Sequence, residues 1–385
     1  MGQESLELHK RLRGKIEIKS KVSIKSPHEI SVAYTPGVAE VCLEIAADKE
    51  KAYEYTSKWN NVAIVTDGTR TLGLGSLGPE AALPVMEGKA VLYKQFGNVD
   101  AFPICLQTAD SEEIIRTVKH IAPVFGAINI EDIETPKALE IVERLTDELD
   151  IPVFHDDQHG TAVVTLAALL NALRFTKRKP EDTSVVVAGA GSAGYGIVRI
   201  LKSIGINDIV VTDSHGVVSK SRPVETMNKY KIELASITNA PDGVSTLAEA
   251  VKRKDVFIGV SGVKNLLTSA MAKSMSKDSI IFPLTNPDPE IHPKDAAGSG
   301  ARVIATGSYK FENRANNALV FPFMMRAILD SRIRRISQQL LVSVAYALAD
   351  MIPKEQLKPF NIVPNVTDPR IQTAVNRAVQ AITAN

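Results

Sequence analysis

Several features are scarce in this chain of 385 residues, and each scarcity excludes a class of protein. There are only two cysteines, Cys42 and Cys105, both in apolar surroundings, which is too few for a disulfide framework and fits a reducing compartment. Basic residues number 45 and acidic residues 44, so no excess charge favours nucleic acid or an anionic membrane as a partner. We also find no signal sequence and no apolar run of 18 residues. We therefore expect a cytoplasmic protein that binds neither nucleic acid nor membrane.

Repeats and low-complexity segments are lacking too, and apolar strands instead alternate with amphipathic helices. Strands are predicted at residues 62–66, 99–106, 127–130, 151–154, 184–188, 208–212, 256–260, 280–284 and 301–306. Helices are predicted at residues 79–96, 112–125, 136–149, 162–175, 195–203, 331–351 and 369–384. Such alternation implies parallel sheets. We predict an α/β protein with an N-terminal wound α/β domain at residues 1–158. A Rossmann-type doubly wound parallel-sheet domain with C-terminal helices follows at residues 159–385.

Acidic pairs follow two of the predicted strands. Asp156 and Asp157 come directly after residues 151–154, and Glu131 and Asp132 come directly after residues 127–130. Ligands of α/β sheets bind at the carboxyl ends of strands, so carboxylates there are placed for chemistry. A capped turn is the alternative for the first pair, because Asp and Thr favour helix starts. The second pair favours a functional site.

Three further residues have both a structural and a functional interpretation. Arg70 lies in a loop with four glycines, at residues 68–78, where an arginine suits a carboxylate clamp. Lys89 lies among apolar residues of a predicted helix, so it either extends to water or is held where its pKa can fall. Tyr34 lies at a turn just ahead of Pro36, which can open the following helix. Extension to water and simple packing are the commoner cases for this lysine and this tyrosine.

A glycine-rich turn opens the second half of the chain. The motif Gly189-Ala-Gly191-Ser192-Ala193-Gly194 joins a predicted strand to a helix, and Asp213 ends the next strand 19 residues after Gly194. This combination predicts a dinucleotide site, with the pyrophosphate at the helix N-terminus and Asp213 on the ribose hydroxyls. Asp213 should repel a 2′-phosphate, which favours NAD over NADP. His215, Lys220 and Arg222 follow closely, so use of both cofactors stays open.

The acidic residues also predict a metal. Glu131, Asp132 and Asp157 offer three hard carboxylates without an accompanying Cys/His cluster, which suits Mg²⁺ or Mn²⁺ better than zinc. Such an ion would act as a Lewis acid on an oxygen of a hydroxy acid or keto acid.

Motifs throughout the chain resemble those of malic enzymes of the small prokaryotic type. The matching motifs are Tyr34-Thr-Pro-Gly-Val-Ala, Asp67-Gly-Thr-Arg-Thr-Leu-Gly-Leu-Gly, Glu87-Gly-Lys89-Ala, Ile130-Glu-Asp132, Phe154-His-Asp-Asp-Gln-His-Gly-Thr161, Thr285-Asn-Pro and Asn316-Asn317. The resemblance implies oxidation of (S)-malate with NAD(P), decarboxylation to enolpyruvate and protonation to pyruvate. Decarboxylation of added oxaloacetate and assembly as a homodimer or larger homo-oligomer are implied as well. His155 departs from the larger eukaryotic type, which has asparagine there.

The resemblance assigns a role to each matching residue. Lys89 corresponds to the general base for the C2 hydroxyl of malate, and Tyr34 to the acid that protonates the enol. Both assignments reverse the structural interpretation given above. Glu131, Asp132 and Asp157 correspond to the metal ligands, with Asp156 beside them. Arg70, Asn286 and Asn317 correspond to the substrate contacts. Asn286 corresponds to a cofactor contact as well.

Two other functions fit part of the pattern. An amino-acid dehydrogenase also pairs a substrate domain with a glycine-fingerprint domain and uses lysine, but it needs no metal, so the three carboxylates speak against it. A catalytically inactive NAD-binding sensor is the second, and the presence of Tyr34, Lys89 and all three acids speaks against that.

Overall fold

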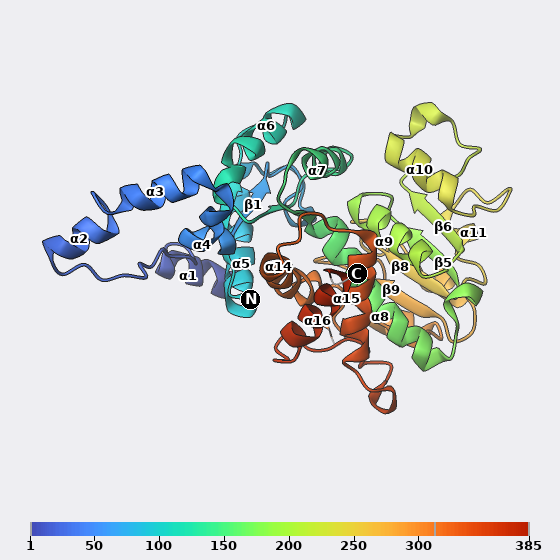
Figure 1. Ribbon diagram of the computed structural model, residues 1–385. Helices are drawn as coiled ribbons and strands as arrows, with labels where there is room; N and C mark the ends of the chain where they lie inside the picture. The colour runs from blue at the N-terminus through green and yellow to red at the C-terminus, as the bar shows by residue number, and fades with distance from the viewer. Residues whose placement is uncertain (1, 312, 384–385) are drawn as a thin grey trace.

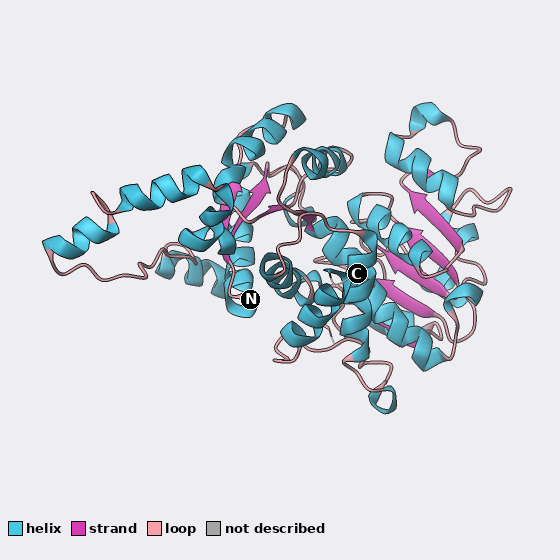
Figure 2. Ribbon diagram, in the orientation of Figure 1, coloured by secondary structure: helices cyan, strands magenta, loops and turns pink. Residues whose placement is uncertain are grey.

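The computed structural model describes residues 2–311 and 313–383, which form two parallel sheets and the helices around them (Figures 1 and 2). The first sheet has the strand order β2-β1-β3-β4. Its strands are β1 (Asn61–Thr66), β2 (Asp100–Cys105), β3 (Ala127–Ile130) and β4 (Val153–His155). All of its pairings are parallel, so the residues that follow β1, β3 and β4 meet at one edge.

Both faces of this sheet are covered, because alternate residues of a strand point to opposite sides. Val62 and Ile64 of β1 join the large core that contains α5 (Pro79–Gly97), whereas Ala63 and Val65 join a second core. That second core includes side chains of α6 (Ser111–Ile121) and α7 (Lys137–Glu148). Burial on both faces explains why the strands read as continuous apolar runs in the sequence.

The second sheet has the order β10-β9-β8-β5-β6-β7 and is parallel except for β7. Its strands are β5 (Ser184–Ala188), β6 (Asp208–Asp213), β7 (Gly216–Val217), β8 (Val256–Gly259), β9 (Ile280–Pro283) and β10 (Val303–Ile304). The chain winds in one direction from β5 and in the other from β8, so the order reverses between these neighbouring strands. The glycine motif follows β5 and therefore lies at the reversal point, where ligands of such sheets bind. The predicted fold class is confirmed.

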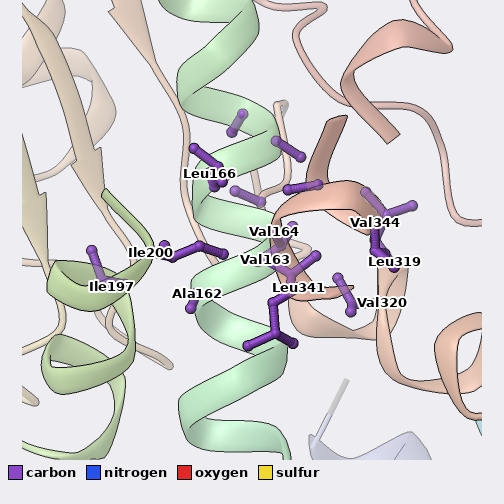
Figure 3. Close-up of a cluster of buried hydrophobic side chains, with 14 of the residues drawn as sticks. Ala162, Val163, Val164, Leu166, Ile197, Ile200, Leu319, Val320, Leu341 and Val344 are labelled. Atoms are coloured by element: carbon purple, nitrogen blue, oxygen red, sulfur yellow. The ribbon is translucent and has the colours of Figure 1, made fainter. Parts of the chain in front are cut away.

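A buried helix joins the two sheets. Helix α8 (Thr161–Thr176) lies between α9 (Ser192–Ser203) and the C-terminal part of the chain, and its residues from Ala162 to Leu173 are all buried. Figure 3 shows its apolar side chains between those of α9 on one side and of the C-terminal elements on the other. The predicted domain boundary after residue 158 falls between β4 and α8, and it stays a prediction.

The C-terminal helices return to the first half of the chain. They are α14 (Phe321–Asp330), α15 (Gln338–Asp350) and α16 (Ile371–Thr383), and they lie centrally in Figure 1. Phe321 of α14 packs edge-on against Tyr93 of α5, with ring centroids 4.8 Å apart. The remaining α-helices are α1 (Gly2–Leu12), α2 (Pro27–Ala33), α3 (Val38–Ala47), α4 (Ala52–Tyr55), α10 (Lys229–Ile237), α11 (Leu247–Ala250), α12 (Ser269–Lys273) and α13 (Pro293–Gly298).

The N-terminal arm, residues 2–47 with α1, α2 and α3, has no buried residue in these three helices, and α2 and α3 extend away from the body (Figure 1). Residues Pro27–Ala47 are long and apolar enough, by length and composition alone, to cross a membrane, although we expected no such run. One segment of this kind is weak support for a membrane span. In the structure it consists of two helices separated by residues 34–37.

Some predicted boundaries were wrong. Strand β4 begins at Val153, and a π-helix (Asp156–Gly160) rather than a turn joins it to α8. The helix predicted for residues 331–351 is helical only as α15, and the strand predicted for 301–306 only as β10. The last predicted helix is α16, with residue 384 outside the described residues. Both cysteines are free thiols, but Cys42 is exposed rather than in apolar surroundings.

Candidate active site

A cavity of about 530 Å³ lies where the carboxyl ends of both sheets face each other. Its wall brings together nine of the residues predicted from the sequence, namely Arg70, Lys89, Glu131, Asp132, Asp156, Asp157, Ala193, Asn286 and Asn317. They come from the loops after β1, β3 and β9, from the π-helix after β4, from α5 and the start of α9, and from the segment before α14. Because these polar side chains come together from distant parts of the chain, they indicate a functional site rather than a set of separate helix caps.

Lys89 lies deep in this cavity and is only 7 % exposed. Its Nζ is 2.9 Å from Glu131 Oε1 and 2.5 Å from Asp156 Oδ2, and it also lies 4.0 Å from the centre of the Phe321 ring. Burial opposes the ammonium form, but the two carboxylates outweigh it and raise the pKa of Lys89 above its ordinary value. The expected depression of this pKa is therefore wrong for the structure described here, and so is extension to water.

The pKa values of the four acids in the cavity are shifted in different directions. Burial raises the pKa of Glu131 and Asp156, although Lys89 acts in the opposite direction. Burial and the neighbouring Asp157 raise the pKa of Asp132 to about 7. Burial also opposes ionisation of Asp157, but the contact of its Oδ2 with His155 Nε2 (3.5 Å) and the charge of Arg70 lower its pKa to about 2. The cavity thus holds more acidic groups than nearby cations can neutralise.

This excess of buried carboxylates fits a hard divalent cation, because oxygen donors are what Mg²⁺ and Mn²⁺ prefer. The side chains are not, however, gathered around one point. Among residues 2–311 and 313–383, no three His, Cys, Asp or Glu side chains form a group ready to hold an ion. Two of these carboxylates already have other partners, because Lys89 donates to Glu131 and His155 contacts Asp157. Ligation by the predicted triad stays a prediction.

The predicted substrate contacts lie on two sides of the cavity. The Arg70 guanidinium lines it, and no hydrogen bond or ion pair of this group occurs within the described part of the chain. Asn317 Nδ2 donates to Asp156 Oδ2 at 2.6 Å, and Asn286 Nδ2 donates to the Gly307 carbonyl at 3.1 Å. Arg70 is therefore the group most available to a substrate carboxylate.

The glycine motif has the geometry of a dinucleotide loop. A Cβ at Gly189 would lie 2.5 Å from the Val260 carbonyl, and one at Gly194 would lie 1.8 Å from the Gly189 carbonyl, so neither position admits a side chain. A Cβ at Gly191 would meet nothing closer than 3.6 Å, which leaves its backbone open to a ligand. Helix α9 begins at Ser192, three residues before the predicted start at Tyr195.

A residue from the first half of the chain contacts this helix start. Thr135 Oγ1 accepts the backbone N–H of Ser192 at 3.1 Å and lies 2.7 Å from Ser192 Oγ. Thr135 belongs to the same loop as Glu131 and Asp132. The position expected for a pyrophosphate is thus adjacent to the loop of the predicted metal ligands.

Asp213 ends β6 as predicted, but its carboxylate is already bound. Arg222 donates to Oδ1 at 2.9 Å, Lys231 donates to Oδ2 at 2.7 Å, and the backbone N–H of His215 donates to Oδ1 at 2.8 Å. Although burial opposes ionisation, the bonds from Arg222 and Lys231 lower the pKa of Asp213. Asp213 is therefore charged, and two cations offset its repulsion of a phosphate. Lys231 had not been predicted.

Tyr34 is the one predicted catalytic residue outside the cavity of its own chain. It is 67 % exposed at the C-terminal end of α2, on the N-terminal arm. Pro36 does not open the next helix, because α3 begins two residues later at Val38.

Three contact residues escaped the sequence analysis. Phe321 lies against Lys89, and the buried pair Tyr93 and Asn129 lies behind Glu131. A signal existed for Tyr93, because it follows Lys89 by four residues and so shares its helix face. No local signal marks Phe321, which is more than two hundred residues away in the sequence.

Comparison with known proteins agrees with this geometry. The family model of the malic enzyme N-terminal domain matches residues 13–146, and that of the malic enzyme NAD binding domain matches residues 158–383. The chain belongs to the malic enzyme family. The bifunctional malic/malolactic enzyme of Bacillus subtilis is 48 % identical over 98 % of this chain and 92 % of its own length. The NAD-dependent malic enzyme of Geobacillus stearothermophilus is 48 % identical over 95 % and 76 %.

A solved structure supports the same assignment. The NAD-dependent malic enzyme of Thermotoga maritima superposes with a TM-score of 0.93 at 45 % identity, covering 97 % of this chain and 98 % of its own. Relatives named NADP-dependent malic enzymes match as well, so membership of the family does not decide the cofactor.

Proposed function

We propose that this chain catalyses the metal-dependent oxidative decarboxylation of (S)-malate to pyruvate and CO₂ with reduction of NAD(P). One observation carries the proposal. The cavity that contains Lys89, Arg70 and the acidic residues also reaches Ala193, at the start of the dinucleotide helix α9. A hydroxy acid held beside Lys89 would therefore lie next to a bound nicotinamide cofactor. The test is formation of pyruvate and reduced cofactor from malate by the purified chain.

The roles of the chain's own residues follow from their positions. Arg70, whose guanidinium lines the cavity, would bind a malate carboxylate, and Asn286 and Asn317 would complete the substrate contacts. Lys89 Nζ would take the proton of the C2 hydroxyl. Asp156 Oδ2, which lies 2.5 Å from Nζ, would orient the ammonium that results. The cavity wall also includes apolar side chains, among them that of Phe321.

The groups that the chain would hold supply the rest of the chemistry. Glu131, Asp132 and Asp157 would hold Mg²⁺ or Mn²⁺, with Asp156 beside them. A bound cation would supply Lewis-acid chemistry for the C2 oxygen and for the negative charge of decarboxylation, and it would neutralise the carboxylates that keep Lys89 protonated. Gly189, Gly191, Ser192, Ala193 and Gly194 would hold the pyrophosphate of the dinucleotide, whose nicotinamide would supply the hydride acceptor. The same site should decarboxylate added oxaloacetate.

We also propose that the enzyme is a homodimer or a larger homo-oligomer in which Tyr34 completes the site of another subunit. The N-terminal arm carries large exposed apolar side chains, including Leu6, Ile18, Val32 and Leu43, which are 63–94 % exposed. A self-complementary contact between two arms would cover them. Tyr34 would then protonate the enol from outside its own cavity.

Cofactor choice follows from the ribose end of the site. A preference for NAD stays the prediction from Asp213, but its ion pairs with Arg222 and Lys231 favour the alternative that NADP is used as well. We further propose a cytoplasmic location, since both cysteines are free.

A further inference from the structure

A chain of buried polar groups runs behind Glu131 into the core between α5 and β3. Tyr93 and Asn129 both have an exposed fraction of 0 %. The Tyr93 hydroxyl is 2.6 Å from Asn129 Oδ1, and Asn129 Nδ2 donates to Glu131 Oε2 at 2.9 Å and to the Ile130 carbonyl at 3.1 Å. Lys89 meets the same carboxylate from the other side, at Oε1. The two residues therefore connect the core to the candidate catalytic lysine through Glu131.

The sequence places these four side chains together in two simple ways. Lys89 and Tyr93 are four residues apart in α5 and lie on one helix face. Asn129 and Glu131 are two residues apart at the end of β3 and point to the same side of the sheet.

The direction of each hydrogen bond follows from whether each partner can donate or only accept. The Ile130 carbonyl can only accept, so the amide nitrogen of Asn129 must face it, and the same nitrogen faces Glu131 Oε2. Its oxygen then faces Tyr93, whose hydroxyl must donate. Burial raises the pKa of Tyr93 well above its ordinary value, so the phenol keeps its proton. The Tyr93 hydroxyl thus sets the orientation of the amide, and the amide binds one oxygen of Glu131.

We propose that Tyr93 and Asn129 are positioning residues that hold Glu131 Oε2 away from the cavity and leave Oε1 for Lys89 and for the divalent cation. The inference rests on the proposed function, because it concerns the metal-binding role of Glu131. A merely structural role explains it less well, since apolar side chains would fill this core without burying a polar network. Tyr93 donates to Asn129, and Asn129 in turn donates to the carboxylate that lines the cavity.

The direct test is the affinity of the chain for Mn²⁺, measured by titration calorimetry or by electron paramagnetic resonance of free Mn²⁺, without malate or cofactor. Tyr93→Phe removes only the hydroxyl, and Asn129→Leu removes the bond to Glu131. Each should weaken Mn²⁺ binding by about tenfold or more, because partners of metal ligands typically contribute 10–100-fold. The double variant should lose little more than Asn129→Leu alone, because both changes interrupt one chain of bonds.

Tyr230→Phe is the matched control, because its hydroxyl donates to Glu143 at 2.9 Å outside the cavity. It should leave Mn²⁺ affinity unchanged. With malate as substrate, Tyr93→Phe should raise the Mn²⁺ concentration needed for half-maximal rate more than it lowers the rate at saturating Mn²⁺.

A Tyr93→Phe protein that melts at a lower temperature but binds Mn²⁺ as tightly as the unaltered chain would overturn the inference and leave the proposed function intact. If Asn129→Leu does not fold, the Mn²⁺ affinity of Tyr93→Phe alone tests the inference. If the unaltered chain binds no Mn²⁺, the metal-dependent function and the inference both fail.

Discussion

Lys89 Nζ lies 2.5 Å from Asp156 Oδ2, although the two residues are 67 positions apart in the chain. The same nitrogen contacts Glu131, so the candidate base is held by two carboxylates at once. This arrangement fixes the lysine beside the expected position of the substrate, and it makes loss of the lysine proton dependent on what else those carboxylates bind.

Replacement of Lys89 or Tyr34 should stop different steps. Lys89→Ala should slow oxidation of malate by a factor of ~10²–10⁴, as loss of a general base does, and small amines should restore part of the rate. Tyr34→Phe should still reduce the cofactor but should slow exchange of the methyl protons of pyruvate with deuterated water. Both variants should bind NAD normally, since neither residue lies in the glycine motif. Equal losses in every partial reaction would contradict this division of roles.

Removal of a predicted metal ligand should abolish turnover together with metal dependence. Asp132→Ala and Asp157→Ala each delete one oxygen donor of the cavity, so the rate at any Mg²⁺ or Mn²⁺ concentration should fall to background. Asp208→Ala is the control, because that carboxylate pairs with Lys254 far from the cavity wall. Malate oxidation that continues undiminished in excess chelator would refute the metal assignment.

A mixed dimer can test whether Tyr34 acts in another subunit. One subunit would carry Lys89→Ala and the other Tyr34→Phe, each with its own affinity tag so that only the mixed species is purified. If Tyr34 acts across the interface, one of the two sites keeps both residues and about half of the normal rate of pyruvate formation should return. A mixed dimer that forms pyruvate no faster than the Tyr34→Phe enzyme, or a monomer in light scattering at working concentration, would rule out the shared site.

The two cations on Asp213 should matter more for NADP than for NAD. Arg222→Ala or Lys231→Ala removes a donor that could bind a 2′-phosphate, and hydrogen bonds to charged groups contribute about 1.5–3 kcal/mol. We expect kcat/KM for NADP to fall on the order of tenfold or more, with a smaller change for NAD. Lys254→Ala is the control, because Lys254 pairs with Asp208 at the other end of β6 from Asp213. Equal losses with both cofactors would show that the cations serve only to hold Asp213.

Features local in the sequence were predictable. The strand that ends at Ile130 and the glycine motif after β5 each combine apolar patterning with a distinctive terminus, and both occur where expected. The π-helix after β4 was not predicted, because residues 156–160 carry no pattern that distinguishes it from a turn. The raised pKa of Lys89 depends on carboxylates 42 and 67 positions away, which local patterning cannot place. The exposed position of Tyr34 depends on the fold of the N-terminal arm, which local patterning does not determine.

The central claim is tested most directly by the stoichiometry of the reaction of the purified chain with (S)-malate, NAD or NADP, and Mn²⁺. Reduced cofactor can be followed by absorbance, pyruvate by a coupled assay and CO₂ by release of label from malate. The account predicts equal amounts of the three products, with none formed when the metal is chelated. Reduced cofactor without pyruvate, or no reaction of malate with either cofactor, would contradict it.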